Sequence, residues 1–348
     1  MESSNNINIL AQVKAARMLR SRRWMWIVGA LVILSIGLWW LTLLLGQSYT
    51  PPSVVWQVLL GQHVPGASFT VGYLRLPRAL VALLVGMSFG MAGVAFQTML
   101  RNPLASPDIV GVSSGSSAAA VLAIVVLNMD GMSVALFSIV AGLAVALLVY
   151  GLSYHNGVAG TRLILIGIGV SAMIESFISY LLSQASAWNL QEAMRWLAGS
   201  INAVQMHQTV PLTLSLLVFG GVLLVRSKDI EALRMGEDTA AALGIKIAQT
   251  RLVVMVCAVG LIAVATAVTG PIAFVAFLSG PIAARLIKTN GSLLLPSAFV
   301  GACLVLSGDY IGQFLLPNRY PVGVVTGALG APYLIYLIVR VNRKGGGL

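Results

Sequence analysis

Two carboxylic acids, Glu175 and Asp309, lie inside long apolar stretches of this sequence. A carboxylate within a membrane span is costly and marks a functional site by default. Proton-coupled transporters use such acids as proton carriers, whereas a paired or neutral acid only fixes how helices pack. Because there are only two, and no basic residue lies deep in an apolar stretch, the sequence favours the structural role for both.

Enzymatic chemistry finds little support in the residue types. The phosphate-binding pattern G-x-x-x-x-G-K-[ST] is absent, so we do not expect this chain to hydrolyse ATP. His63, His155 and His207 stand apart from one another and show no zinc-ligand spacing. Cys257 and Cys303 fall in apolar stretches, where a free thiol acts as a small apolar side chain. We expect no catalytic residue, no metal site and no cofactor in this chain.

Arg75 and Arg78 stand three residues apart in the segment RLPR, at the start of an apolar stretch. The topology derived below puts them on the outer face of the membrane, where basic residues are uncommon. A rigid positive patch at this place suits docking of an acidic partner. The alternative is that both side chains extend to lipid headgroups.

The stretch from 101 to 117 combines prolines with a cluster of serines. Asn102-Pro103 and Ser106-Pro107 interrupt the helix between two apolar runs. Irregular backbone within a membrane is tolerated where it is buried in protein or lines a cavity. Ser113 and Ser114 would then give that cavity a polar wall.

Residues 226–251 form the only long internal segment rich in charge, since nine of its 26 residues are Asp, Glu, Lys or Arg. Asp238 and Thr239 are typical N-terminal caps of a helix, and Gly244 is a typical stop after the run that follows them. A short helix lying across the membrane surface would suit docking to a soluble protein. The alternative is a solvated loop with one helical turn.

The composition indicates an integral membrane protein. Of the 348 residues, 58% are hydrophobic and 9% are charged, compared with about 25% charged in a soluble domain. The net charge of +11 comes from short basic flanks between apolar runs, so it reports membrane topology and not nucleic-acid binding. The first apolar run, 24–46, exceeds the roughly 7–15 residues of a signal-peptide core, so we expect an uncleaved span.

A span needs about 20 apolar residues, which predicts an all-α, polytopic protein of about ten transmembrane helices. The run 252–288 is too long for one crossing, and we divide it at Gly270-Pro271 into a tight helical hairpin. The predicted spans are 24–45, 79–100, 109–128, 132–153, 163–184, 209–225, 252–269, 271–288, 293–316 and 320–340.

An even number of spans puts both termini on one face. That face would hold 17 of the 21 Lys and Arg residues, which assigns it to the cytoplasm. We therefore expect a basic cytoplasmic N-tail (1–23), a single transmembrane domain (24–340) with a cytoplasmic loop at 226–251, and a cytoplasmic C-tail (341–348). Glycines four apart, such as Gly86 and Gly90, allow close helix crossing within this domain.

Six motifs in fixed order give the chain a family likeness: RLPR (75–78), a span containing GMAG, RNPLASPDIVG (101–111), MGEDTAAALGI (235–245), TGPIAFVAF (269–277) and PVGVVTGALGAPYL (321–334). Together they resemble the iron-siderophore permeases, type II ABC importer subunits that also include the cobalamin permease. The likeness extends from about Trp24 to Arg340. It implies a ten-helix permease subunit of a bacterial cytoplasmic (inner) membrane that is not itself an enzyme.

The resemblance also implies partners. A second permease subunit, identical or a sister, would enclose a central pathway; two ATPase subunits carrying ATP and Mg would dock from the cytoplasm; and a substrate-binding protein would dock outside with ferric siderophore. On this model the ATPase-coupling helix comprises Gly236, Glu237, Asp238, Ala242, Leu243 and Gly244. Arg75 and Arg78 match arginines that meet acidic residues of the binding protein.

The same likeness assigns a translocation pathway to the stretch after Asn102, and we include with it Pro103, Ser113, Ser114 and Glu175. Two departures from the family pattern stand out. The usual Pro-His with paired arginines is replaced by the segment 280–285, which lacks the His and the first Arg. The usual Glu-Leu-Pro is replaced at 319–321, where Arg319 would enlarge the docking patch or contact an anionic ferric chelate.

The sequence thus predicts the permease subunit of an ATP-driven importer of ferric siderophore. The same machine moving cobalamin or haem remains an alternative. A proton-coupled secondary transporter that uses Glu175 and Asp309 is an alternative of another class. Sequence alone does not distinguish a homodimer from a heterodimer.

Overall fold

The computed structural model describes residues 2–153, 160–202, 204–288 and 291–343, and within them every regular element is a helix. His155 and residues 344–348 of the expected C-tail lie outside the described residues. The helices are α1 (Glu2–Leu44), α2 (Pro52–Leu59), α3 (Leu76–Leu100), α4 (Val112–Val125), α5 (Gly131–Ser153), α6 (Gly160–Ser183), α7 (Ala187–Leu197), α8 (Thr209–Ser215), α9 (Gly221–Val225), α10 (Ser227–Leu233), α11 (Glu237–Ala242), α12 (Ile247–Thr269), α13 (Val275–Ile287), α14 (Leu294–Tyr310) and α15 (Val322–Arg343).

The ten predicted spans each coincide with a helical segment. Seven segments are long and apolar enough to cross a membrane: 14–44, 68–100, 131–153, 161–183, 206–225, 247–269 and 294–315. Three further apolar helices, 112–125, 275–287 and 322–337, are shorter. The shorter α4 and α13 begin after irregular backbone. Their missing turns correspond to the interruptions that the prolines predicted.

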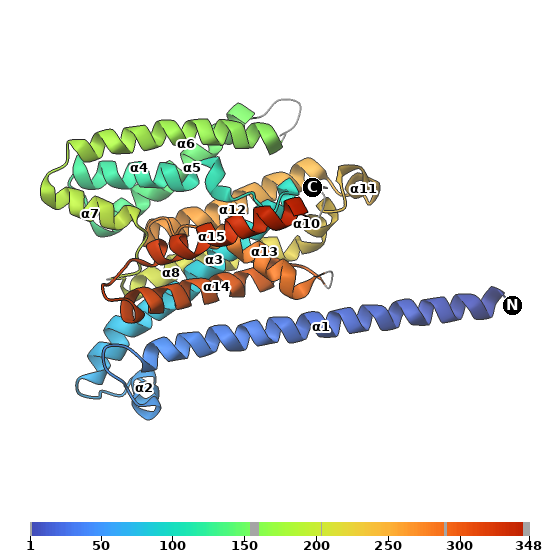
Figure 1. Ribbon diagram of the computed structural model, residues 1–348, viewed down its shortest axis with the longest axis horizontal. Helices are drawn as coiled ribbons and strands as arrows, with labels where there is room; N and C mark the ends of the chain where they lie inside the picture. The colour runs from blue at the N-terminus through green and yellow to red at the C-terminus, as the bar shows by residue number, and fades with distance from the viewer. Residues whose placement is uncertain (1, 154–159, 203, 289–290, 344–348) are drawn as a thin grey trace.

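Helix α3 lies at the centre of the bundle and contacts α12, α13 and α14 (Figure 1). Its crossing with α14 is close because glycines face backbone: a side chain at Gly86 or Gly90 would collide with carbonyl oxygens of α14, and one at Gly301 would collide with α3. Between helices in lipid, such backbone proximity supplies the packing that a hydrophobic driving force supplies in water. The predicted role of the Gly86/Gly90 pair is confirmed.

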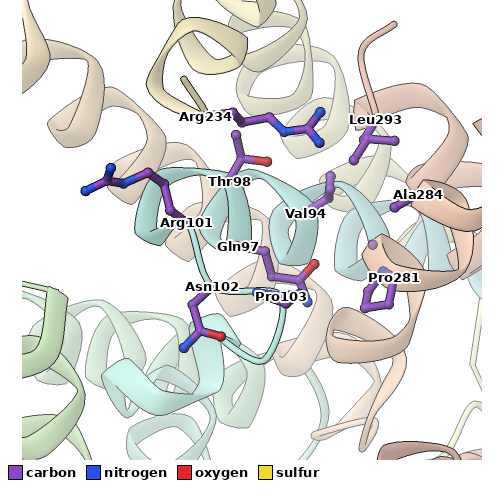
Figure 2. Close-up of a pocket in the computed structure, with 11 residues that line it drawn as sticks. Val94, Gln97, Thr98, Arg101, Asn102, Pro103, Arg234, Pro281, Ala284 and Leu293 are labelled. Carbon is purple, nitrogen blue, oxygen red and sulfur yellow. The ribbon is translucent and has the colours of Figure 1, made fainter. Parts of the chain in front are cut away.

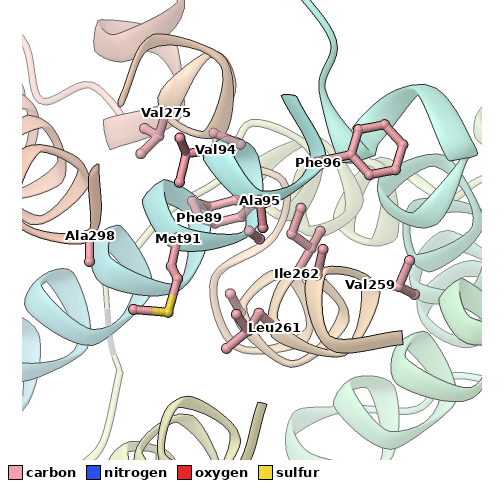
Figure 3. Packing of buried hydrophobic residues seen from close by; sticks show 14 of the residues in the cluster. Phe89, Met91, Val94, Ala95, Phe96, Val259, Leu261, Ile262, Val275 and Ala298 are labelled. Atoms are coloured by element: carbon pink, nitrogen blue, oxygen red, sulfur yellow. The ribbon is translucent and has the colours of Figure 1, made fainter. Parts of the chain in front are cut away.

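Apolar side chains fill the space around α3. Phe89 and Phe96 are fully buried, and Ile262 of α12, Val275 of α13 and Ala298 of α14 meet them from three neighbouring helices (Figure 3). These helices therefore form one core with α3 as its common member.

The chain breaks between α12 and α13, where the sequence predicted it. Gly270 has a φ of 71°, which strongly favours glycine, and α12 ends one residue earlier at Thr269. The expected tight hairpin is wrong, however. The two helices have little contact with each other, and both pack against α3. Because α3 already occupies the space between them, they cannot pair as neighbours.

Both ends of the bundle carry short helices outside the spans. The N-terminus, the end of α15 and the helices α10 and α11 lie at one end, and α2 and α7 lie at the other (Figure 1). This arrangement agrees with the prediction that both termini and the charged segment share a face. Sequence reasoning missed α2 and the amphipathic α7, because both are shorter than a span.

The α3–α14 crossing predicts a large effect of added volume. Gly90→Val would drive methyl groups into the Ser297 carbonyl and should destabilise the protein by about 3 kcal/mol. Thermal unfolding of the detergent-purified protein should show a lower Tm. Gly37→Val on α1, where nothing lies within 4 Å of the added Cβ, is the matched control. Equal Tm values for the two variants would contradict this account of the packing.

Candidate functional site

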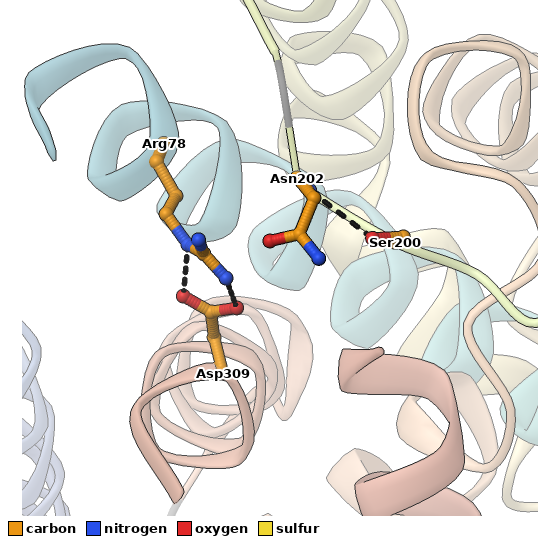
Figure 4. A network of polar contacts seen from close by, with 4 residues as sticks. All are labelled: Arg78, Ser200, Asn202 and Asp309. Carbon is orange, nitrogen blue, oxygen red and sulfur yellow. Dashed lines mark hydrogen bonds and ion pairs between the residues drawn. The ribbon is translucent and has the colours of Figure 1, made fainter. Parts of the chain in front are cut away.

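At the start of α3, Arg78 is held by a buried acid. Its Nε donates to Asp309 Oδ2 at 2.7 Å and its Nη2 to Asp309 Oδ1 at 2.5 Å, a two-pronged ion pair between α3 and α14 (Figure 4). The Asp309 side chain is only 7% exposed. This pair fits the structural role that the sequence favoured for Asp309, although the sequence named no basic partner for it. Arg78 stands at the start of its helix, and only the tertiary fold brings it to Asp309.

Arg75 is also engaged, but by backbone. Its Nη1 donates to the Leu43 carbonyl at 2.9 Å and its Nη2 to the Ser48 carbonyl at 2.7 Å. These carbonyls belong to the end of α1 and to the loop after it, where a helix leaves its last carbonyl groups without partners. The RLPR segment therefore ties α1 to α3, and both of its arginines have hydrogen-bond partners within the chain.

A cavity of about 250 Å³ opens beside these two arginines. Arg319, which is exposed, lines it together with Gln313, whose buried Nε2 has no hydrogen-bond partner in the described residues. The three arginines and one acid give the cavity an excess of positive charge. Arg319 and Gln313 therefore supply donors that Asp309 does not satisfy.

The polar stretch after α3 divides between two cavities. Asn102 and Pro103 line an inner cavity of about 310 Å³ with Gln97, Arg101 and Arg234 (Figure 2). The buried Gln97 donates to the Phe277 carbonyl at 3.0 Å, which fixes α3 against α13. Asn102 and Pro103 thus lie directly after the last residue of α3, apart from Ser113 and Ser114.

Ser113 lines a second cavity, of about 450 Å³, with Asp108, Phe274 and Phe277. Its hydroxyl donates to Asp108 Oδ1 at 2.5 Å, and the Ser106 hydroxyl lies 3.0 Å from Oδ2. The Asp108 carboxylate is thus held by two hydroxyl groups. Sequence reasoning missed Asp108, although the SPD segment that carries it had been singled out.

The other two predicted pathway residues lie elsewhere. Ser114 is partly buried on α4. Glu175 is exposed on α6, which packs on α4 and leaves an apolar face open. Glu175 and Asp309 therefore occupy different environments, one open and one buried against an arginine. Among the described residues, no three His, Cys, Asp or Glu side chains gather into a metal-binding group.

The charged segment folds into two short helices, α10 and α11. Buried Ala232 and Leu233 of α10 pack against Ala240 of α11. The predicted stop at Gly244 is confirmed, since it has a φ of 82° and Ile245 N–H donates to the Ala240 carbonyl at 3.0 Å. The predicted caps Asp238 and Thr239 are wrong.

Helix α11 begins earlier because Gly236 precedes it with a φ of 106°. This turn lets Glu237 start the helix, where a carboxylate is favoured by the helix dipole. The six residues predicted for coupling to the ATPase differ in their exposure to solvent. Asp238, Ala242, Leu243 and Gly244 are exposed, whereas Gly236 and Glu237 are partly buried.

Glu237 contacts two other helices. Its Oε1 accepts a hydrogen bond from Arg251 of α12 at 2.6 Å and lies 3.5 Å from Arg101 Nη2 at the end of α3. The end of α11 away from Glu237 is apolar, because Leu243, which follows the last residue of the helix, is 60% exposed.

The comparison with family models identifies the chain. The model of the FecCD transport family matches residues 31–340. The chain belongs to the FecCD transport family. Relatives from several bacteria match this chain over most of their own length. The ferric enterobactin transport system permease protein FepG of Escherichia coli is 40% identical over 91% of this chain and 96% of its own, and the iron(3+)-hydroxamate import system permease protein FhuG of Bacillus subtilis is 32% identical over 91% and 97%.

A solved structure also matches most of the chain. A structure described as an inward-facing conformation of a metal-chelate type ABC transporter has a TM-score of 0.81 and 28% identity, and it covers 90% of this chain and 99% of its own. The similarity therefore extends over nearly all the helices described above. It agrees with the all-α, membrane-spanning architecture.

The Arg78–Asp309 pair predicts a stability effect that depends on charge balance. Asp309→Asn leaves a partly buried guanidinium without its counter-ion and should cost about 3 kcal/mol. The double variant Arg78→Met/Asp309→Leu removes both charges and should recover most of the Tm. Asp229→Asn, which breaks the more exposed pair with Arg226, should cost less than about 1 kcal/mol. A double variant as unstable as the single one would contradict this assignment.

Proposed function

We propose that this chain is the membrane-spanning permease subunit of an ATP-driven importer that carries ferric siderophore across the bacterial inner membrane. The observation that carries the proposal is a match to the FecCD family across most of the chain, together with an exposed short helix at one end of the bundle. The similar proteins named above are permeases of iron-chelate transport systems, which supports iron chelate as the substrate class.

Helix α11 is the proposed contact with an ATPase subunit; the complete importer would have two such subunits, which would bind ATP and Mg. It lies beyond the spans at the end that carries both termini, in line with cytoplasmic termini (Figure 1). Its exposed apolar tip at Leu243 suits insertion into a groove on a soluble protein, the way a helix is commonly recognised. Closure of the ATPase dimer would move α11 and change access along the pathway.

The outer cavity is the proposed contact for the substrate-binding protein. Arg319 and Gln313 face it with donor groups, and Arg75 and Arg78 add positive charge. Long-range electrostatic attraction would draw an acidic side chain of the partner towards this surface before contact. Because Arg78 already has a counter-ion, Arg319 carries the larger share of the recognition.

A second permease subunit is proposed to cover the exposed face of α6 and to complete the pathway. Glu175 on this face and Ser113 beside Asp108 would then line the route from the two sides of α4. The pathway needs no tight site of its own if the binding protein selects the substrate.

ATP coupling through α11 predicts a loss of transport when its tip is altered. Leu243→Asp should lower uptake of radio-iron-labelled siderophore at least about tenfold and remove the ATPase subunits from the purified complex, because a charge replaces an apolar anchor. The measurement compares cells with equal amounts of permease in the membrane.

Leu60→Asp is the matched control, since Leu60 is similarly exposed at 63% but lies next to α2 at the other end. Normal uptake by Leu243→Asp, together with loss of uptake on adding a protonophore or in Glu175→Gln, would instead indicate a proton-coupled carrier. Competition with cobalamin and haem distinguishes the other substrates of such a machine.

Docking at the outer cavity predicts an effect of charge reversal. Arg319→Glu should weaken binding of the substrate-binding protein about tenfold or more and flatten its dependence on salt, because a long-range attraction becomes a repulsion. Binding to detergent-purified importer at several salt concentrations measures both. Arg195→Glu, an exposed arginine of α7 at the same end, is the control. Unchanged affinity in Arg319→Glu would rule out this docking surface.

A further inference from the structure

We propose that Glu237 is a positioning residue that joins the coupling helix α11 to the buried helices α3 and α12, so that movement of α11 is delivered through its carboxylate. This inference rests on the proposed function and goes beyond it. It assigns Glu237 to transmission within the permease, and it leaves contact with the ATPase to the exposed residues of the same helix.

The geometry at Glu237 supports a joint. The residue opens α11, and one carboxylate oxygen lies between two guanidinium groups, 2.6 Å from Arg251 and 3.5 Å from Arg101. Arg251 stands in the second turn of α12, and Arg101 follows the last residue of α3. A single side chain of α11 thus contacts residues of two other helices, α3 and α12.

The backbone on both sides of this contact is specialised. Gly236, directly before Glu237, has a φ of 106°, and Arg101 has a φ of 51° in the left-handed region that a non-glycine residue seldom adopts. An added Cβ at Gly236 would lie 3.8 Å from the Arg101 guanidinium. The two left-handed turns bring the end of α3 and the start of α11 face to face, which places the carboxylate within reach of Arg101.

The two helices that receive the contact suit transmission. Helix α3 has 25 residues, which gives it a length of roughly 37 Å, and most of its side chains are buried. Its outer end carries Arg78, which is fixed to Asp309 of α14. A displacement at Arg101 would therefore move α3 as a unit. The residues at the start of α3, including Arg78, line the proposed docking cavity, so the displacement would reach that cavity.

The contact between Glu237 and the two arginines is partly exposed, so its role in transmitting movement can be tested without destabilising the fold. The side chains of Glu237 and Arg101 are 42% and 48% exposed, and that of Arg251 is 23% exposed. Ion pairs of a carboxylate this exposed contribute little to the stability of a fold. Apolar packing of Ala240 against α10 keeps α11 in place without the carboxylate. Removing Glu237 should therefore disconnect α11 from α3 and leave the fold intact.

The test uses the complete importer reconstituted in lipid with its binding protein and ferric siderophore. In Glu237→Ala, the stimulation of ATP hydrolysis by the loaded binding protein should fall at least about fivefold, and uptake should fall with it. The amount of ATPase subunit that co-purifies with the permease should stay within about twofold of the unmodified protein, because the exposed residues of α11 are unchanged.

Glu231→Ala is the matched control. It removes a glutamate from the neighbouring α10 whose partner, Arg234, lies on the same short segment, so the broken ion pair bridges no helices. Stimulation should be retained in this variant. Loss of stimulation in both variants would overturn the proposal, because any loss of charge near α11 would then have the same effect.

Arg101→Gln, alone and in a double variant with Glu237→Ala, tests the contact between Glu237 and the end of α3. If Arg101 and Glu237 act through one contact, the double variant should lose no more stimulation than Glu237→Ala alone. If the double variant loses more stimulation than Glu237→Ala alone, by the product of the two single losses, the proposal is overturned. Loss of the ATPase subunits in Glu237→Ala would also overturn it, and would make Glu237 a docking residue. Full stimulation in Glu237→Ala refutes only this inference, whereas normal uptake by Leu243→Asp refutes the proposed function.

Discussion

The close crossing of α3 and α14 is the constraint on which the rest of the structure depends. In lipid, burying apolar surface between helices gives little free energy, so helices associate through close backbone packing and complementary shape. Gly86, Gly90 and Gly301 provide that proximity, and α12 and α13 then pack on the remaining faces of α3. A central helix held in this way reaches both ends of the bundle as one rigid element.

The charges are placed according to this arrangement. At the start of α3, Arg78 and the buried Asp309 form an ion pair with little exposure to solvent, and such a pair stabilises only if both partners are present and well oriented. At the other end of α3, Glu237 meets two arginines at the protein surface, where an ion pair contributes little to stability but still fixes a direction of contact. The Arg78–Asp309 pair thus holds two packed helices together, whereas the Glu237 group connects a peripheral helix to that core.

The irregular backbone within the bundle has a common role. The breaks after α3 and between α12 and α13 shorten α4 and α13, and the residues that replace the missing turns line the cavity shared by Ser113, Asp108 and Phe274. Polar groups of such backbone need partners within the protein, because lipid offers none. The hydroxyls of Ser106 and Ser113 meet this need for the Asp108 carboxylate.

The sequence by itself determined the membrane class, the positions of the spans, the shared face of both termini and the short helix that ends at Gly244, because apolar length, basic flanks and glycine are local signals. It missed α7, whose length is too short for a span. Only the tertiary structure decided that Arg78 meets Asp309, that Arg75 is bound to backbone carbonyls, and that Glu237 turns inward while Leu243 turns outward. The ion-pair and hydrogen-bond partners lie far apart along the chain, and the exposure of Glu237 and Leu243 depends on which helices pack beside α11, so no local pattern records them.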